Sequence, residues 1–264
     1  MIDHRWQLGL LGWALGATIL TTLYLRQLRT LNATTVDAGW ALSLVGTAAL
    51  DAVLGPGAVS QRVLIAALAG LENLRLAVLV VRRAGGGEDR RYRDLRARWS
   101  ERGREQLSFA IFYQAQAAVA ALLALPFVLA CFNRSSRIAA VEWAGIALWL
   151  VAATGEAVAD AQLAQFVSHP SNKGHTMQRG LWRYSRHPNY FFQTLTWLAY
   201  GLVAVGAPWG WLGFLSYAVI LYLVLFVSGI PPAERQSQRS RGDEFRTYQR
   251  RTSVFVPWFP SRTA

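Results

Sequence analysis

The chain has 264 residues, 53% of them hydrophobic, and its 27 Lys and Arg against 15 Asp and Glu give a formal net charge of +12. Long apolar runs alternate with short segments that hold most of the arginines, which is the pattern of membrane helices and their loops. The single cysteine, Cys131, excludes intrachain disulfides, zinc sites built on cysteine and CxxC redox chemistry.

Seven apolar runs are expected to be membrane helices, because about 20 apolar residues are needed to cross ~30 Å of hydrocarbon. The second run is the shortest, and the fifth is long enough to project from the bilayer at its C-terminal end. In chain order the runs are residues 8–25, 39–54, 59–81, 107–131, 138–166, 190–207 and 209–228.

The basic residues predict the orientation of the chain. With seven spans and the N-terminus outside, the cytoplasmic segments are residues 26–38, 82–106, 167–189 and 229 onward. They hold 22 of the 27 Lys and Arg, against four on the external side (Arg5, Arg62, Arg134 and Arg137), and Arg75 lies within a span. We therefore expect an all-α polytopic protein with about seven transmembrane helices, a cytoplasmic C-terminus and a single membrane domain over residues 1–264. Nearly all the basic residues are Arg, and we expect a bacterial inner membrane.

Polar groups inside the third span are candidates for the reaction centre. A charge at mid-bilayer costs at least ~2.5–3.5 kcal/mol, so such groups usually face a cavity, a partner or a substrate. Glu72 and Arg75 are three residues apart and share one helix face, where they can form an ion pair. The alternative, functional interpretation places Glu72, Asn73 and Arg75 at a catalytic centre.

The fifth span carries two acids on one face, Glu156 and Asp160, four residues apart. Two like charges this close repel unless hydrogen-bond donors lie between or opposite them. Gln162 extends the polar stretch toward the cytoplasmic end. A ribose, an amide or an arginine from the next loop would satisfy these groups, and we favour a ligand over a structural role.

The third cytoplasmic segment contains the densest polar block, residues 180–190. Arginine forks suit phosphate oxygens, and tyrosine and asparagine bond sugar or amide groups. A positive-inside anchor with interfacial aromatics would explain the arginines and tyrosines but gives no reason for His187 or Asn189. The cofactor candidates in this block are Tyr184, Arg186, His187, Asn189 and Tyr190.

Two other cytoplasmic segments add cofactor candidates. Arg90, Arg91 and Tyr92 lie in the second segment, where both phosphate capture and attraction to anionic lipid are plausible. Acidic residues mixed with these arginines favour a folded, salt-bridged element over a plain lipid-binding patch. Tyr248, in the polar segment after the last span, completes the set.

Taken together, these motifs resemble the bacterial steroid 5-alpha-reductase-like membrane family, a group long described as a domain of unknown function. That family is related to sterol reductases and to isoprenylcysteine-type methyltransferases. The likeness covers roughly residues 69–260. It is carried by residues 88–92 (EDRRY), by Glu156-x-x-x-Asp160-x-Gln162, and by residues 180–184 and 186–190 (GLWRY and RHPNY).

The resemblance implies a seven-helix enzyme that holds NADPH in a cytoplasm-facing cavity and passes hydride to an activated carbon–carbon double bond. In the steroid reductases an acid of the fifth helix, then a tyrosine and an asparagine before the sixth, line the nicotinamide nucleotide. These match Asp160, Tyr184 and Asn189. The family's carbonyl-polarising tyrosine lies three residues before an arginine, and here Glu72 takes that place before Arg75.

NADPH, a lipophilic substrate and membrane lipid are therefore the expected partners, with no metal, no nucleic acid and no obligate protein partner. One alternative is a membrane methyltransferase that uses S-adenosylmethionine, whose cationic sulfur and lack of phosphate give no reason for so many arginines. Methyltransferases of this type also tend to carry paired glutamates after the last helix, whereas Glu234 is followed by Arg235. Another is a lipid-binding or transport protein, although no inverted repeat is evident.

Overall fold

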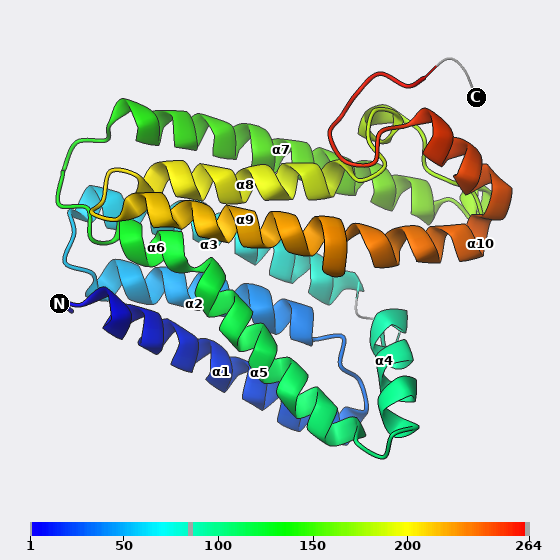
Figure 1. The fold of residues 1–264 in the computed structure, drawn as a ribbon, viewed down its shortest axis with the longest axis horizontal. Helices are drawn as coiled ribbons and strands as arrows, with labels where there is room; N and C mark the ends of the chain where they lie inside the picture. Colours follow the sequence, from blue (N-terminus) through cyan, green and yellow to red (C-terminus); the bar gives the residue numbers. More distant parts are fainter. Residues whose placement is uncertain (1, 84–86, 262–264) are drawn as a thin grey trace. The chain divides into compact units, whose positions relative to one another are not determined.

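The computed structural model describes residues 2–83 and 87–261, and within them every regular element is helical (Figure 1). The all-α prediction is confirmed for this part of the chain. The α-helices in chain order are α1 (Arg5–Thr30), α2 (Val36–Leu54), α3 (Val59–Arg83), α4 (Arg90–Ser100), α5 (Glu105–Leu123), α6 (Leu125–Ala130), α7 (Ala140–Ser168), α8 (Pro188–Ala204), α9 (Phe214–Tyr222) and α10 (Ile230–Arg251).

Among the described residues, six helical stretches are long and apolar enough to cross a membrane, by length and composition. They are α1, α2, α3, the α5–α6 pair, α7 and the stretch Gly210–Arg251, which contains α9 and α10. The prediction of an integral membrane protein is supported to that extent. The run predicted as the sixth span forms α8, which has 17 residues and is shorter than each of these six stretches.

The chain forms two compact units, which are described separately. Unit 1 comprises residues 1–143 and 200–216, and unit 2 comprises residues 144–199 and 217–264. The boundaries fall within α7, α8 and α9.

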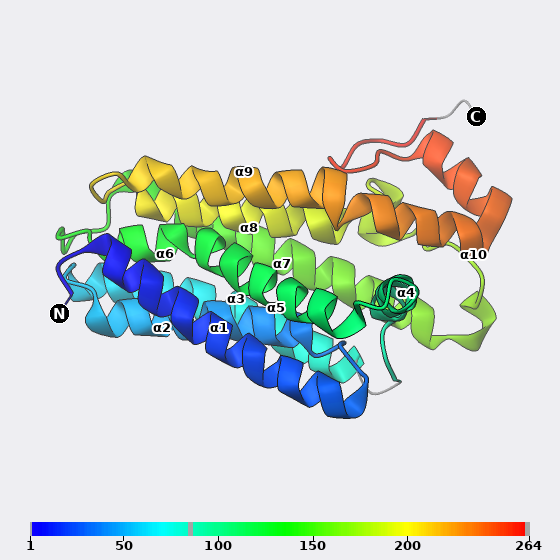
Figure 2. The ribbon, with the colours of Figure 1, turned by 60° about the horizontal axis from the view of Figure 1, so that its bottom comes forward.

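Unit 1 is built on α2, which packs against α1 on one side and α3 on the other, while α1 also packs against α5 (Figure 2). Small residues let α1 and α2 approach closely. A Cβ added to Gly12 would lie 2.7 Å from Cγ2 of Thr47, and one added to Gly39 would lie 2.3 Å from Cδ1 of Leu23. A larger residue at either position would therefore force the side chain of Thr47 or Leu23 to move.

The fourth predicted span is interrupted, which the sequence interpretation missed. Its residues form α5 and the short α6, with the break at Ala124 and Pro126 in the first turn of α6. Proline has no N–H to continue the helical ladder, and its ring clashes with the preceding turn. The two helices nevertheless form one apolar stretch, Glu105–Ala130.

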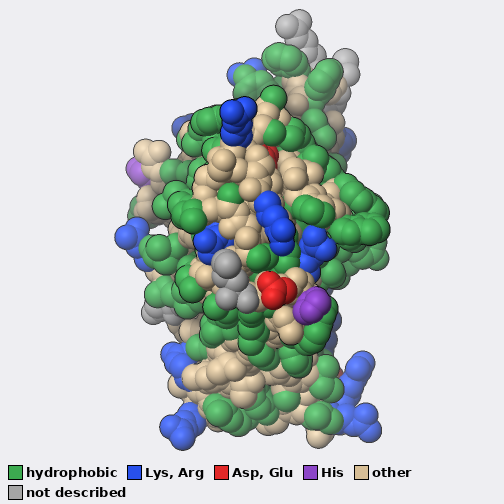
Figure 3. Space-filling model, turned by 90° about the vertical axis from the view of Figure 1, so that its left-hand side faces the viewer, with side chains coloured by type: hydrophobic (Ala, Val, Ile, Leu, Met, Phe, Trp, Pro, Cys, Tyr) green, Lys and Arg blue, Asp and Glu red, His purple; other side chains and the backbone are tan. Residues whose placement is uncertain are grey.

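One end of unit 1 holds a buried polar cluster around Glu142, at the start of α7. Its carboxylate accepts hydrogen bonds from the side-chain amides of Gln61 (3.2 Å) and Asn133 (2.8 Å) and from the Ala139 N–H (2.6 Å). Figure 3 views the molecule from this end, with Lys and Arg side chains scattered among hydrophobic ones. The cluster ties the loop before α7 to α3.

In unit 2, α7, α8 and α9 lie side by side (Figures 1 and 2). After α9 the helix widens into a π-helical turn, Leu223–Val227, and stops before Gly229. The polar helix α10 follows and reverses direction at Gly242, whose φ of 55° is in the left-handed region. Gln238 and Gln249 join the two arms of α10 with a hydrogen bond of 3.0 Å. The helix is therefore a hairpin.

Candidate functional site

The predicted site residues fall into two groups, one in each unit. Unit 1 contains the proposed catalytic residues on α3 and the basic residues of α4. Unit 2 contains the polar end of α7, the loop before α8 and the α10 hairpin.

Glu72 and Arg75 form an ion pair on α3. Nη2 and Nε of Arg75 lie 2.6 and 3.2 Å from Oε1 of Glu72, and only 10% of the Glu72 side chain is exposed. Asn73 donates from its amide to the Ala69 carbonyl, one turn earlier in the same helix (2.8 Å). The predicted pairing is therefore confirmed, and it gives Glu72 a nearby cation inside an apolar helix.

The helix α4 is fastened to the first turn of α2 through Asp37. One carboxylate oxygen accepts from Nη2 of Arg91 (2.8 Å) and the other from the Tyr92 hydroxyl (2.5 Å). Burial, together with the charge of Asp37, raises the pKa of Tyr92, so the phenol keeps its proton and donates. Arg91 and Tyr92 thus have structural partners, while Arg90 is exposed.

The centre of this attachment is Arg96, which was not among the predicted site residues. Its guanidinium donates to Glu88 (2.8 and 3.1 Å), to Glu105 and to Gln27 (3.2 Å), and lies 4.6 Å from the ring centroid of Phe109. The prediction of a folded, salt-bridged element is confirmed by these contacts.

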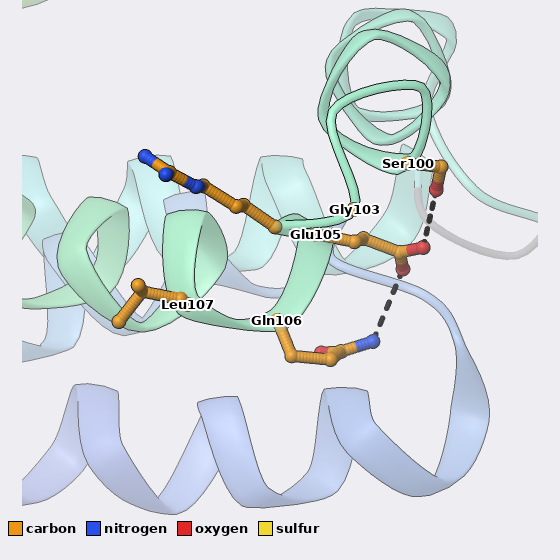
Figure 4. A pocket seen from close by; sticks show the side chains of 6 residues that line it. Ser100, Gly103, Glu105, Gln106 and Leu107 are labelled. Carbon is orange, nitrogen blue, oxygen red and sulfur yellow. Dashed lines mark hydrogen bonds between the residues drawn. The ribbon is translucent and has the colours of Figure 1, made fainter.

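A hollow beside the turn from α4 to α5 contains none of the predicted site residues. Its lining includes Glu105, which accepts from the Ser100 hydroxyl and the Gln106 amide (Figure 4). Glu105 also binds Arg96, so the polar groups of the hollow serve to hold α4 in place.

In unit 2 the structure brings Asp160 and Asn189 together. The amide of Asn189, in the first turn of α8, donates to Oδ1 of Asp160 on α7 at 3.3 Å. Both Asp160 and Glu156, one turn earlier, are buried. The donor that two acids on one face require is thus supplied in part by a residue of the predicted block.

Gln162 fixes the position of the loop that leads to α8. Its Oε1 accepts from the Leu181 N–H (2.9 Å), and a Cβ added to Gly180 would lie 2.5 Å from this amide. Gly180 also has a φ of 58°, so glycine is favoured there for two reasons. The indole of Trp182 donates to the Ala159 carbonyl (3.0 Å), which binds the same loop to α7.

The side chain of Arg186 points at α10 and at the residue that follows it. Its Nε donates to Glu234 (2.6 Å) and its Nη1 to the carbonyls of Gln249 (3.0 Å) and Thr252 (2.6 Å). Within residues 2–83 and 87–261, Nη2 makes no hydrogen bond, and its N–H groups are the ones available to a phosphate. The predicted phosphate ligand therefore first serves to hold α10 against the loop.

Glu234 is a site residue that the sequence-based set omitted. Besides Arg186, it accepts from the amide of Gln249 (2.8 Å), and Nε2 of His187 lies 3.3 Å from its Oε1. Glu234 lies in polar α10, beyond the apolar stretch that ends before Gly229. Burial raises its pKa, but the hydrogen bonds from His187 and Arg186 dominate and lower it from 4.5 to about 2. Glu234 is therefore ionised at neutral pH.

Tyrosines support the same loop. Tyr248 of α10 directs its hydroxyl at the carbonyls of Trp182 and Ser185, and burial raises its pKa, so it remains a neutral donor. Tyr190 stacks on the ring of His187, with centroids 5.5 Å apart and planes 10° apart. Tyr184 is partly exposed.

Within residues 2–83 and 87–261, no group of three or more His, Cys, Asp or Glu side chains is placed to hold a metal ion. No curated protein and no solved structure matches the chain. A family model matches residues 23–252, which extends further toward the N-terminus than the likeness noted from the motifs. The chain therefore belongs to the family described as "Protein of unknown function (DUF1295)".

Proposed function

We propose that the protein is an NADPH-dependent membrane reductase that transfers hydride to an activated carbon–carbon double bond of a steroid-like or other lipophilic substrate. The observation that carries the proposal is the contact between Asp160 and Asn189, which joins the acid and the amide of two separate motifs at 3.3 Å. These are residues that the resemblance to the steroid 5-alpha-reductase-like family assigns to the cofactor.

The chemistry of this donor set fits a nicotinamide nucleotide. Carboxylates accept from ribose hydroxyls or a carboxamide, and the asparagine amide offers both a donor and an acceptor. The exposed side chains of Arg179 and Arg183, in the loop before α8, are available for phosphate oxygens.

NADPH, when bound, would supply the hydride, so the protein needs no nucleophile or metal of its own for that step. The protein's tasks are to orient the nicotinamide, polarise the acceptor and deliver a proton. Following the resemblance, we assign orientation of the nicotinamide to Asp160 and Asn189. The place of Glu72 before Arg75, where the family carries its polarising tyrosine, supports the assignment of acid help to Glu72, with Asn73 next to it in the sequence. Acid catalysis by a positioned side chain contributes about 10²–10⁴-fold in typical enzymes.

NADPH binding is expected to raise the unfolding temperature of detergent-purified protein more than NADP, NADH or S-adenosylmethionine does, because a ligand of the native state stabilises by mass action. A thermal unfolding series with the four compounds makes this measurement. Stabilisation by S-adenosylmethionine alone would replace the reductase by the methyltransferase alternative. Stabilisation by none of the four would favour a lipid-binding or transport protein.

Replacing Asn189 by Ala is expected to weaken NADPH binding about tenfold, equivalent to a hydrogen bond of roughly 1.4 kcal/mol. The matched control is Gln165→Ala, which removes an exposed amide from the polar end of α7 and should leave NADPH affinity unchanged. Titration of each folded variant with NADPH measures the effect. Equal affinity in both variants would remove Asn189 from the cofactor site.

The proposed arrangement in the membrane has seven spans, with α8 as the sixth, and a cytoplasmic cofactor site in a bacterial inner membrane. The basis is the concentration of 22 basic residues in the segments assigned to the cytoplasm. A reporter fused after Ala264 is expected to be cytoplasmic, and one inserted near Asn133 external. The opposite result at either position would contradict the seven-span arrangement.

A further inference from the structure

The segment after α10 forms a closed loop, residues 252–261, which we name the C-terminal loop (Figure 1). Its two ends meet, since the Ser261 N–H donates to the Arg251 carbonyl at 2.9 Å. Along its length it is bound to the residues before α8. The Arg186 N–H donates to Ser253 (2.8 Å), the Ser185 hydroxyl to the Phe255 carbonyl (2.7 Å), and the Trp258 N–H to the Tyr184 carbonyl (2.8 Å).

The outer face of the C-terminal loop is apolar. Alternate residues of the extended chain point outward, and the exposed fractions are 39% for Val254, 54% for Val256 and 70% for Trp258, with Phe259 at 78%. Phe255, between the two valines, is partly buried. Large apolar side chains gathered on an ordered loop mark an interaction surface, because their exposure to water is unfavourable.

Two observations identify what covers this face. The ring of Phe255 packs on Phe191, in the first turn of α8, with centroids 5.6 Å apart, so the loop continues the apolar surface of a helix that lies beside the membrane-length α7. At the base of the loop, Arg250 and Arg251 form the exposed last turn of α10. Tryptophan and phenylalanine beside arginine are typical of segments at the headgroup level of a membrane.

We propose that the C-terminal loop is a membrane-interface anchor. Val254, Val256, Trp258 and Phe259 enter the boundary between headgroups and acyl chains, and Arg250 and Arg251 bind anionic headgroups. The apolar face and the positive charge of the two arginines at its base fit one occupant, the bilayer in which the protein's helices are embedded. Because the loop is bonded to Tyr184, Ser185 and Arg186, its attachment also holds the block before α8 at the membrane surface.

The test uses the full-length protein in nanodiscs that contain one chain each, with phosphatidylcholine and about one third phosphatidylglycerol. Val256→Cys is labelled with an environment-sensitive fluorophore, and Ser240→Cys, an exposed position on the first arm of α10, is the matched control. Cys131 is fully buried, so the native thiol gives little background labelling. We expect blue-shifted emission at position 256, with strong quenching by lipids that carry a nitroxide near the headgroup, and neither effect at position 240.

Charge provides the second measurement. Replacing both Arg250 and Arg251 by Gln is expected to reduce the quenching at position 256 in discs with phosphatidylglycerol, and to have little effect in discs of phosphatidylcholine alone. Water-like emission at position 256, or quenching equal to that at position 240, would overturn the proposal. A blue shift that requires two chains per disc would overturn it as well and assign the face to a second copy of the protein.

Discussion

Replacing Glu72 by Gln is expected to lower turnover by about 10²–10⁴-fold while NADPH affinity and the fold are retained. The carboxyl group is held against Arg75 at 2.6 Å inside an apolar helix, where an acid has both a fixed orientation and a low-dielectric surrounding. Gln keeps the shape and a hydrogen-bond acceptor but cannot take up a proton from water and pass it to the acceptor, as the carboxylate of Glu72 would. Single-turnover NADPH oxidation with an enone or sterol-like acceptor measures the loss.

The same substitution distinguishes catalysis from structure. If Glu72 serves only as the partner of Arg75, Gln leaves a partly buried guanidinium with a weaker partner, and the loss appears as lower stability with normal turnover of the folded fraction. In that case Glu72→Gln with Arg75→Gln should recover stability, because both charges are gone. The next acid to replace would be Asp51, which is fully buried near the end of α2 and whose carboxyl oxygens accept no hydrogen bond from any residue that the structure describes.

In the described part of the chain, six of the seven predicted spans correspond to helical stretches long and apolar enough to cross a membrane, because length and charge set this property of an apolar run. What the runs did not reveal is their internal geometry. Pro126 breaks the fourth run into α5 and α6. The residues at the break are themselves apolar, so the run's hydropathy gives no sign of it. Glu142 escaped notice for a related reason: it lies at the start of a long run, and its partners Gln61 and Asn133 come from distant segments.

The site could be predicted as motifs but not as contacts. Asp160 and Asn189 are 29 residues apart, and their meeting depends on the packing of α8 beside α7. Arg186 was expected to bind phosphate, yet most of its donors are occupied by Glu234, 48 residues later, and by backbone carbonyls. That arrangement depends on the reversal of α10 at Gly242, and a glycine in a polar helix is the one sequence signal that could have indicated it.

Replacing Glu234 by Gln is expected to lower the free energy of unfolding by about 2–3 kcal/mol, somewhat less than the ~3–5 kcal/mol found when a fully buried ion pair loses one partner. The side chains are 10% exposed for Arg186 and 17% for Glu234, so water screens the pair slightly. The matched control is Asp243→Asn, which breaks the exposed pair with Arg246 and should cost less than about 1 kcal/mol. Chemical unfolding of the full-length protein, monitored by limited proteolysis of α10, measures both free energies.

The pH dependence of the free energy of unfolding tests the Arg186–Glu234 interaction independently. The pKa of Glu234 is lowered from its ordinary 4.5 to about 2, because the hydrogen bonds from His187 and Arg186 outweigh the effect of burial. A lowered pKa means that the folded state binds the proton less tightly than the unfolded state does. The resulting stability is therefore fully present above about pH 4.5 and is lost as the pH falls toward 2. The stability difference between the wild type and Glu234→Gln should accordingly shrink over this range, and a difference that stays constant would show that Glu234 contributes through packing rather than through its charge.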